Sequence, residues 1–476
     1  MNTDRSRISE EQTPRGKSRR RTAIGGVLRI TTGVGLALVT FASLLVIGPI
    51  VQMSADGATA GARPGPKSRP STAGAPIVVA VALGVSGTDG YDAFGPYEVF
   101  ARSKKFQVYT VAETSMPVPL NGGLSVRPAY TFDDVASGRA KKPDLVVVPA
   151  VNDPAGKVES QLRDWITSQA DGGSRVLAIC AGARVLAATD LLDGRKATSH
   201  WSRIASLKAS DPEVDWVSGQ RYVQDGPITT TAGVTSGIPA SLQVMRQLAG
   251  DDEAQAVGHA LRYPTWFLDE SSAIPVQHWD VGDVSAALNL TLPWLRPHVG
   301  VVLSDGISEA DAIAPFEVNN YSSAAQLVPI ATGYSITTQN GVVIETTPVA
   351  QLRTKLDRVI APAASSSKEL PSAINAWASQ RGISITPKPG GSAGAAFNTS
   401  LTDLAAQTNT ATAVSVAKML EYPTRGLRMV SGNDPRVPVL LILTILVSVV
   451  VGLTPTIITR QRRARLSRQA KSRPQS

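Results

Sequence analysis

Short runs of apolar residues alternate with amphipathic segments through the middle of the chain. Runs at 77–83, 106–112, 144–149 and 175–179 have the length and composition of strands that are buried on both faces. The stretch 158–169, between the last two runs, has its apolar positions at helical spacing. This alternation of strand and helix predicts an α/β fold with a parallel sheet and helices on both faces.

Two longer apolar runs, 30–51 and 437–458, carry no charged residue. About 20 such residues cross a hydrocarbon core, so both runs are predicted to be transmembrane helices. A buried core helix is the alternative, but such helices are normally shorter and amphipathic. Residues 58–60, Ala-Thr-Ala, resemble the cleavage site of a secretory signal, but the first run is longer than the usual apolar region of about 7–15 residues. An uncleaved anchor is therefore favoured.

The distribution of charge along the chain predicts its topology. The chain has 47 basic and 38 acidic residues and a net charge of +9. Residues 1–23 hold seven basic and three acidic side chains, 459–476 hold seven basic and no acidic ones, and the remainder is nearly neutral. Basic residues outside both spans predict a cell-membrane protein with both termini in the cytoplasm and 52–436 outside it. The lipid bilayer is thus an expected partner. No nucleic acid is expected, because no DNA-binding motif accompanies the charge.

The segment between the spans begins with a stalk. Residues 52–76 are rich in Gly, Ala, Pro and Ser and are typical of a flexible linker. The predicted organisation is a basic tail 1–29, a span 30–51, a linker 52–76, a complete domain 77–297, a shorter second domain 298–436, a span 437–458 and a basic tail 459–476.

The folded part contains an internal duplication. The segment Asp-Ala-Phe-Gly-Pro-Tyr-Glu-Val at 92–99 recurs as Asp-Ala-Ile-Ala-Pro-Phe-Glu-Val at 311–318. The offset between matched segments later falls from 213 to 159 residues, so the second copy is shorter by about 54 residues and lacks the part that contains Cys180 and His200. We predict a truncated, degenerate copy that packs on the first as a cis pseudo-dimer. The other matches are 121–122 with 340–341, 144–150 with 357–363, and 261–265 with 420–424.

Cys180, the only cysteine, follows a predicted strand and precedes a predicted helix. A nucleophile on such an elbow is lifted out of the sheet. The N–H groups that open the helix, beginning with Ala181, lower a thiol pKa and stabilise an oxyanion. Gly182 permits the close approach of neighbouring backbone. A lone cysteine in apolar surroundings is also a common core residue, so an inert Cys180 is the alternative.

Glu98 and His200 are the candidate partners of this thiol. Glu98 lies in a predicted Gly-Pro-Tyr-Glu turn after the first strand, and loops after parallel strands meet at the carboxyl edge of the sheet. A carboxyl group there can accept or share the thiol proton. A solvated acid in the first turn of a helix is the alternative, which the recurrence of Glu98 as Glu317 favours. His200, 20 residues after Cys180, would orient or accept a proton, or cap the next helix.

These residues resemble the ThiJ/PfpI family of the class I glutamine amidotransferase-like superfamily, and most of all the amidotransferase-like domains of AraC-type transcription regulators. The resemblance is carried by 92–99, 178–201 and 229–240, and covers 77–265 well and 298–424 only as a degenerate copy. It implies a flavodoxin-like α/β sandwich with an elbow cysteine facing a loop glutamate. Members include chaperone or glyoxalase-like proteins, isocyanide hydratases, peptidase-like enzymes and sensory domains.

The sequence departs from two branches of that family. Ala181, not a histidine, follows Cys180, and no His-x-Glu pair lies near the end of the first copy, which argues against protease-like and glutaminase activity. With one cysteine and four histidines, neither a metal nor another cofactor is expected. Two functions remain open. One is a cysteine-dependent hydratase, lyase or hydrolase acting on a small electrophile. The other is a non-catalytic module of a membrane-bound regulator that binds a small ligand or senses an oxidant.

Overall fold

The computed structural model describes residues 75–432 apart from 264–266, 270, 291 and 292, together with scattered positions between 439 and 461. The first predicted span, 30–51, and most of the predicted linker lie outside the described residues, and the span 437–458 is described only in part. Within what is described, no helix is both long and apolar enough to cross a membrane. The chain divides into two compact units, and the one described below is Ile50–Val437.

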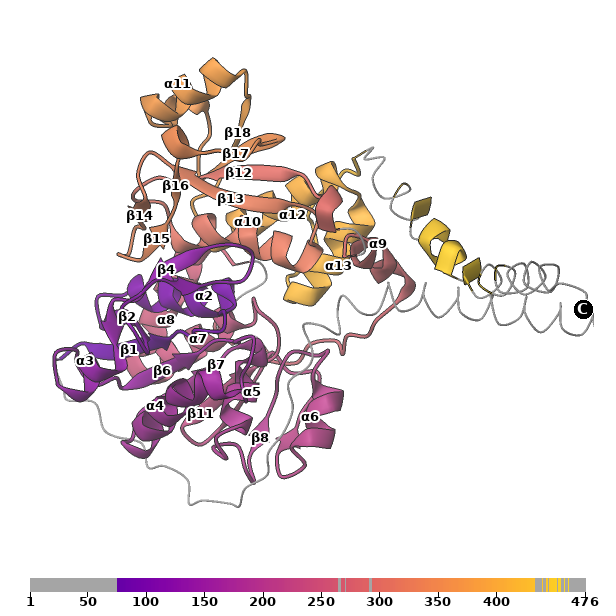
Figure 1. The fold of residues 1–476 in the computed structure, drawn as a ribbon. Helices are drawn as coiled ribbons and strands as arrows, with labels where there is room; N and C mark the ends of the chain where they lie inside the picture. The colour runs from indigo at the N-terminus through magenta and orange to yellow at the C-terminus, as the bar shows by residue number, and fades with distance from the viewer. Residues whose placement is uncertain are drawn as a thin grey trace, which may run out of the picture. The chain divides into compact units, whose positions relative to one another are not determined.

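A seven-stranded sheet forms the centre of residues 75–263 (Figure 1). Its strands are β1 (Ile77–Ala82), β2 (Phe106–Ala112), β5 (Tyr130–Thr131), β6 (Leu145–Val148), β7 (Arg175–Ala178), β10 (Tyr222–Asp225) and β11 (Ile228–Thr231). They lie in the order β10-β11-β7-β6-β1-β2-β5, and all neighbours are parallel except β10 and β11. The four predicted strands coincide with β1, β2, β6 and β7, so the predicted α/β class with a mostly parallel sheet is confirmed.

Helices cover both faces of this sheet because its central strands are apolar on both sides. Ile77, Val79 and Val81 of β1 enter one core, whereas the residues between them enter the other. The first face is covered by α2 (Gly90–Ala101), α7 (Gly237–Ala249) and α8 (Asp251–Leu261), and the second by α3 (Phe132–Ala136), α4 (Ser160–Asp171), α5 (Ala183–Ala187) and α6 (Ile204–Ser210). A pair of short strands, β8 (Lys196–Ala197) and β9 (Asp215–Trp216), lies beside the sheet.

Residues 298–422 form a second, smaller parallel sheet. Its strands are β12 (His298–Val302), β13 (Gln326–Ala331), β16 (Thr347–Pro348), β17 (Arg358–Pro362) and β18 (Ile385–Lys388), in the order β16-β13-β12-β17-β18. The helices of this part are α10 (Glu309–Ser322), α11 (Ser372–Arg381), α12 (Ala393–Gln407) and α13 (Thr410–Leu420), with α9 (Val284–Leu288) preceding them. The chain passes from β18 almost directly into α12, so this sheet ends at β18.

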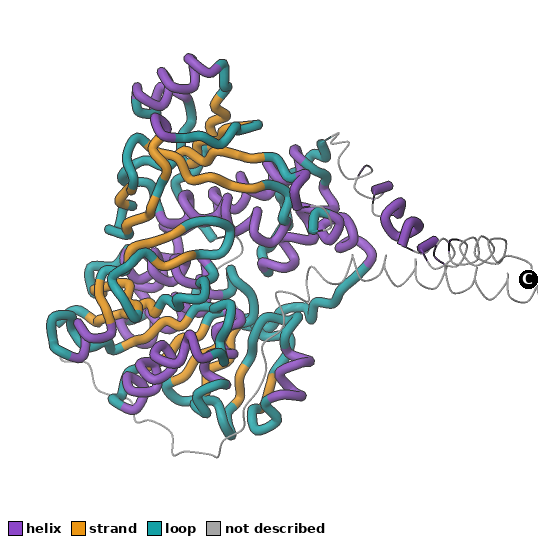
Figure 2. The backbone as a smooth tube through the Cα atoms, viewed as in Figure 1, coloured by secondary structure: helices purple, strands orange, loops and turns teal. Residues whose placement is uncertain are grey.

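The two sheets share one apolar core. Helices lie between the two sheets (Figure 2). Helix α10 packs against α2, and apolar residues of α2, α7, α10, α12 and α13 belong to a single buried cluster. A four-stranded antiparallel sheet also joins the two parts, through β3 (Val118–Pro119), β4 (Ser125–Arg127), β14 (Ser335–Thr337) and β15 (Val343–Glu345). In it Val126 pairs with Ile344. Residues 75–263 and 298–422 therefore pack against each other and bury a common apolar core.

The predicted turn at 95–98 is wrong, because Pro96, Tyr97 and Glu98 lie inside α2. The helix starts at its N-cap Asp89, whose side chain accepts a hydrogen bond from the Asp92 N–H at 3.3 Å. Residues 90–100 are all buried, and this packing outweighs the helix-breaking tendency of Pro96. Glu98 consequently lies six residues, or about 9 Å along the axis, beyond Asp92 and away from the carboxyl edge of the sheet.

Candidate active site

Cys180 lies on a sharp turn between β7 and α5. Its φ of 55° is in the left-handed region, which a residue other than glycine rarely adopts. The turn continues as a single 3-10 segment, Cys180–Gly182. A Cβ atom on Gly182 would lie 2.1 Å from the Val148 carbonyl oxygen, so only glycine fits where the elbow crosses the end of β6.

Side chains from two neighbouring segments hold the backbone of Cys180 in this conformation. Its N–H donates to Thr231 Oγ1 at 2.9 Å, and its carbonyl oxygen accepts from Ser199 Oγ at 3.0 Å. The Ala181 N–H donates to the sulfur. The predicted elbow thus positions the thiol with a backbone donor beside it, which is the arrangement needed to stabilise negative charge on the sulfur or on an oxygen bound next to it.

The carboxyl group that contacts this thiol belongs to Asp92, not to the predicted Glu98. Asp92 lies in the first turn of α2, at the carboxyl edge of β1, and its side chain is hydrogen-bonded to that of Cys180. Its Oδ2 also accepts from the Ala150 N–H at 3.1 Å. Both side chains are buried, with exposed fractions of 0 % for Asp92 and 2 % for Cys180. The acid and the nucleophile therefore form one buried pair.

Two further acids extend this pair, and one of them comes from the second sheet region. Asp89 is hydrogen-bonded to Glu317 of α10, and Glu317 Oε2 also accepts from the Tyr91 N–H at 3.0 Å. The Tyr321 hydroxyl donates to Asp89 Oδ2 at 3.3 Å. Burial is the main cause that raises the pKa values of all three carboxyl groups, Asp89, Asp92 and Glu317. Mutual repulsion raises those of Asp92 and Glu317 further.

The same surroundings act on the thiol. Burial, followed by the negative charges of Asp92 and Asp89, raises the pKa of Cys180 well above its ordinary value. The sequence predicted the opposite direction, because it considered the start of the helix and not the acidic cluster. A nearby cation is Arg203. Burial lowers the Arg203 pKa, and the negative charge of a Cys180 thiolate raises it. Burial and the neighbouring acids therefore favour the protonated form of the Cys180 thiol.

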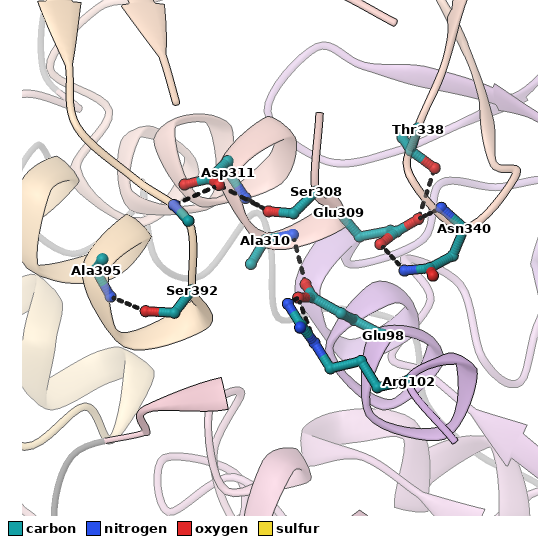
Figure 3. Close-up of polar contacts among 11 residues, drawn as sticks. Glu98, Arg102, Ser308, Glu309, Ala310, Asp311, Thr338, Asn340, Ser392 and Ala395 are labelled. Atoms are coloured by element: carbon teal, nitrogen blue, oxygen red, sulfur yellow. Dashed lines mark hydrogen bonds and ion pairs between the residues drawn. The ribbon is translucent and has the colours of Figure 1, made fainter. Parts of the chain in front are cut away.

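Glu98 instead belongs to the contact between α2 and α10. Its Oε2 accepts from the Ala310 N–H at 2.9 Å, and its Oε1 is paired with Arg102 (Figure 3). Burial raises the Glu98 pKa, and Arg102 offsets part of this rise. Both carboxylate oxygens are thus engaged by groups outside the Cys180 elbow. The predicted pairing of Glu98 with Cys180 is corrected accordingly.

His200 is buried beside the site with both ring nitrogens engaged. Nε2 lies 2.8 Å from the Met419 carbonyl oxygen, which can only accept, so Nε2 carries the proton. Nδ1 lies 2.8 Å from Ser202 Oγ. Burial lowers the His200 pKa to about 4, so the ring is neutral at physiological pH. In this state the ring links the elbow region to the end of α13, and no ring nitrogen is left to accept the thiol proton.

The end of α13 closes the site. Glu421 Oε2 accepts from the Gly233 N–H at 2.7 Å and from Ser236 Oγ at 2.8 Å, and burial raises the Glu421 pKa to about 7. A cavity of about 30 Å³ remains beside it, lined in part by Ser199 and Trp201. That volume holds about one water molecule, and Cys180 is not among the residues that line the cavity. A substrate therefore needs movement of this segment to reach the buried thiol.

No group of three or more His, Cys, Asp or Glu side chains among the described residues is arranged to hold a metal ion. The groups of this chain that surround the site are a thiol, a carboxyl group with a raised pKa, the Arg203 cation and the Ala181 N–H.

A mostly parallel α/β sheet with a strained cysteine elbow beside a buried acid is typical of α/β proteins whose functional residue is a cysteine. Comparison with known proteins identifies the family. The family model that matches, over residues 78–247, is that of the DJ-1/PfpI family. Isonitrile hydratase of Pseudomonas putida is 34 % identical over 175 residues, which cover 36 % of this chain and 72 % of that protein. The chain therefore belongs to the DJ-1/PfpI family, and the resemblance identified from the sequence is confirmed.

Relatives of other kinds share the same part of the chain. The HTH-type transcriptional regulator CdhR of Pseudomonas aeruginosa is 35 % identical over 141 residues, which cover 30 % of this chain and only 40 % of the regulator. The crystal structure of Drosophila melanogaster DJ-1beta matches with 25 % identity and a TM-score of 0.35, covering 39 % of this chain and 97 % of that one. The match to CdhR supports the predicted likeness to transcription regulators at the level of the shared domain.

Sequence reasoning missed Asp92, Glu317, Tyr321, Arg203 and Glu421. Asp92 had a visible signal, because it opens the repeated motif that was used to propose Glu98. Glu317 was visible as the recurrence of Glu98 in the repeat, but nothing in the sequence indicated that it reaches the site. Tyr321 and Glu421, from the second sheet region, and Arg203, from the loop before α6, carry no local signal.

Proposed function

We propose that residues 77–263 form a cysteine-dependent enzyme site that adds water to a small electrophilic carbon, as in a hydratase, with Cys180 as nucleophile and Asp92 as acid and base. The observation that carries this proposal is the buried hydrogen-bonded pair of Cys180 and Asp92. The 34 % identical isonitrile hydratase supports an isonitrile as the first substrate to test. Lyase and hydrolase reactions on other small electrophiles use the same groups and remain within this proposal.

The pair can carry out the addition without a further cofactor. As Cys180 sulfur bonds to the terminal carbon of an isonitrile, the thiol proton passes to Asp92, whose raised pKa suits it to this task. Asp92 returns the proton to that carbon, which gives a thioimidate. Water then adds to the same carbon, and one of its protons passes to the nitrogen. The carbon–sulfur bond breaks as the other proton passes to sulfur, and an N-substituted formamide leaves. The Ala181 N–H and Arg203 stabilise negative charge on the sulfur.

Turnover of a small aliphatic isonitrile tests this proposal. The formyl proton of the product formamide is followed by NMR with the full chain and with Cys180→Ser. We expect formamide from the wild type and none above the uncatalysed rate from Cys180→Ser, whose melting temperature serves as the folding control. Equal rates for the two proteins would contradict a nucleophilic Cys180.

The depth of the thiol favours a second candidate, a non-catalytic module that binds a ligand or senses an oxidant. Cys180 is 2 % exposed and its pKa is raised, which are features of a protected cysteine rather than a reactive one. Within this second candidate they favour ligand binding over oxidant sensing, because a sensor cysteine needs an accessible thiolate. Titration with hydrogen peroxide and mass spectrometry of the Cys180 peptide distinguishes the two. A sensor forms the sulfenic or sulfinic acid without turning over isonitrile, whereas an enzyme gives formamide.

We propose further that residues 298–422 are a degenerate second copy that acts as a cis partner. Reciprocal contacts support this. Glu98 and Glu317 occupy matching positions in the two repeats, and so do Tyr91 and Ala310. Glu98 accepts from the Ala310 N–H, and Glu317 accepts from the Tyr91 N–H, so the same contact is made in both directions. Such exchange is the signature of a two-fold interface. If 77–297 expressed alone is a stable, soluble monomer, this proposal is wrong.

We also propose that the protein is anchored in the cell membrane by the apolar runs 30–51 and 437–458, with both basic tails in the cytoplasm and 52–436 outside. The absence of charge in both runs and the basic flanks support this. Protease added to intact cells should digest 52–436. Protection of this segment from outside would overturn the topology.

A further inference from the structure

A cavity with a mainly apolar lining lies in the second sheet region, and Cys180 is not among its lining residues. It is a cavity of about 280 Å³ between α10, α12 and one face of strands β12, β17 and β18. All residues that line it fall between Pro297 and Thr408. This volume is near the lower end of the range for small-molecule sites, about 300–1,000 Å³.

The loop between β18 and α12 borders the cavity through Pro389, and Asp311 lines it from α10. Asp311 Oδ2 accepts from the Gly391 N–H at 2.9 Å and from Ser308 Oγ at 2.8 Å (Figure 3). A Cβ atom on Gly390 would lie 2.0 Å from Asp311 Oδ1, so the loop passes directly against this carboxyl group. The Asp311 side chain therefore fastens the loop to α10 and has little capacity left for a ligand.

The walls of the cavity are mainly apolar. Val299, Val318, Ile360 and Leu404 contribute to them, and each is otherwise buried in the protein core. Apolar walls on both the helix side and the sheet side favour a ligand with an apolar body, because burying it removes its surface from water.

A cluster of three charged side chains, Arg358, Lys388 and Asp403, also lines the cavity. Arg358 and Lys388 both pair with Asp403, with Arg358 Nη1 at 2.8 Å and Lys388 Nζ at 2.6 Å from Oδ1. These two cations lower the Asp403 pKa although the carboxyl group is buried. Two cations share one carboxylate, so one positive charge remains in excess at this group, and the ammonium of Lys388 has N–H donors beyond the one that Asp403 accepts.

Two further acids line the cavity, Asp357, which is exposed to solvent, and Asp311. Backbone N–H groups donate to both and leave their charges in place, but occupy the oxygens that accept. Asp357 Oδ2 accepts from the His298 N–H at 2.9 Å, and Asp311 is fastened to the loop as described above. The N–H donors of Lys388 and Arg358 are thus the groups that can hydrogen-bond to the head group of a ligand. Such cationic donors favour an acceptor that carries negative charge.

We propose that this cavity binds a small amphipathic anion, with an apolar chain between α10, α12 and the sheet and a carboxylate head at Lys388 and Arg358. The site goes beyond the proposed hydration reaction, because it uses none of the residues around Cys180. It gives the second sheet region a binding function of its own, in the part of the chain that has no cysteine.

Isothermal titration of the full chain with sodium octanoate tests the proposal, with octylamine and acetate as probes of charge and of chain length. We expect saturable binding of one octanoate per chain and neither octylamine nor acetate binding at the same concentrations. Lys388→Gln should weaken octanoate binding at least tenfold, whereas Lys368→Gln, which removes an exposed cation elsewhere, should leave it unchanged.

A second variant keeps the test independent of the ion pairs. Ser400 lines the cavity from α12, and Ser400→Phe fills the space without removing a charge. It should abolish octanoate binding while the melting temperature without ligand stays close to that of the wild type. Absence of octanoate binding to the wild type, equal binding by Lys388→Gln, or binding of octylamine as tight as that of octanoate would each overturn the proposal.

Discussion

Asp92 and Cys180, 88 residues apart in the sequence, form a hydrogen-bonded pair of acid and thiol at the carboxyl edge of the first sheet. The pair is sealed by residues of the second sheet region, since Glu317 reaches Asp89 and Glu421 packs over Gly233. The reactivity of the single cysteine is therefore set by groups from both halves of the folded unit.

Removing the charge of Asp89 should make Cys180 more reactive. The Asp89 charge contributes to the raised thiol pKa, and Asn is as good an N-cap for α2 as Asp. In Asp89→Asn we expect a lower thiol pKa and faster alkylation by iodoacetamide at pH 7.5, by about tenfold for each unit of the shift. Asp153→Asn, which removes an acid that has no part in the thiol pKa shift described above, serves as the control. An unchanged or slower rate in Asp89→Asn would argue against an acidic cluster around the thiol.

Glu421 should make stability depend on pH. Its folded-state pKa of about 7 is above its ordinary value of 4.5, so between these values the folded protein holds a proton that the unfolded chain has released. The free energy of unfolding therefore falls as pH rises from 4.5 to 7, by up to about 3 kcal/mol from this group. In Glu421→Gln that contribution should vanish.

Urea denaturation at pH 5 and pH 7 measures this effect. The wild type should lose more stability than Glu421→Gln over that interval, and Glu213→Gln, at an exposed position, should behave as the wild type. Parallel pH profiles for wild type and Glu421→Gln would show that this carboxyl group is not buried at the site.

Part of this arrangement could be predicted from the sequence. The four apolar runs became β1, β2, β6 and β7, and the elbow at Cys180 lies where the strand–turn–helix pattern placed it. These features depend on local periodicity and on burial on both faces of a strand. The wrong assignment of the acid followed from one local error, a turn predicted at Pro96, which moved Glu98 to the sheet edge that Asp92 occupies.

The rest depends on packing between distant segments. Glu317 and Tyr321 reach Asp89, and Glu421 raises the thiol pKa, only because α10 and the end of α13 fold against 75–263. No spacing within the first copy signals their approach. The direction of the thiol pKa shift was wrong for the same reason. A helix start alone favours a thiolate, whereas burial among acids from both regions favours the thiol.

The elbow should not tolerate a larger residue at its third position. In Gly182→Ala the added methyl group would meet the Val148 carbonyl oxygen at 2.1 Å, so strand and turn must separate. We expect a loss of about 1–3 kcal/mol in the free energy of unfolding, as for overpacked core sites. Gly333→Ala is the matched control, because the nearest atom to its Cβ is the Ser335 carbonyl oxygen at 3.6 Å. Equal stability of the two variants in urea would contradict the close approach at Gly182.

The pH dependence of Cys180 alkylation in the wild type and in Asp92→Asn tests the central claim, that Asp92 and Cys180 act as one pair. In the wild type the rate should still be rising above pH 9, because burial and the Asp92 charge raise the thiol pKa. In Asp92→Asn the whole profile should move to lower pH, since the neutral amide removes that charge, while formamide production from an isonitrile is lost with the proton carrier. Superimposable alkylation profiles for the two proteins would contradict the pairing.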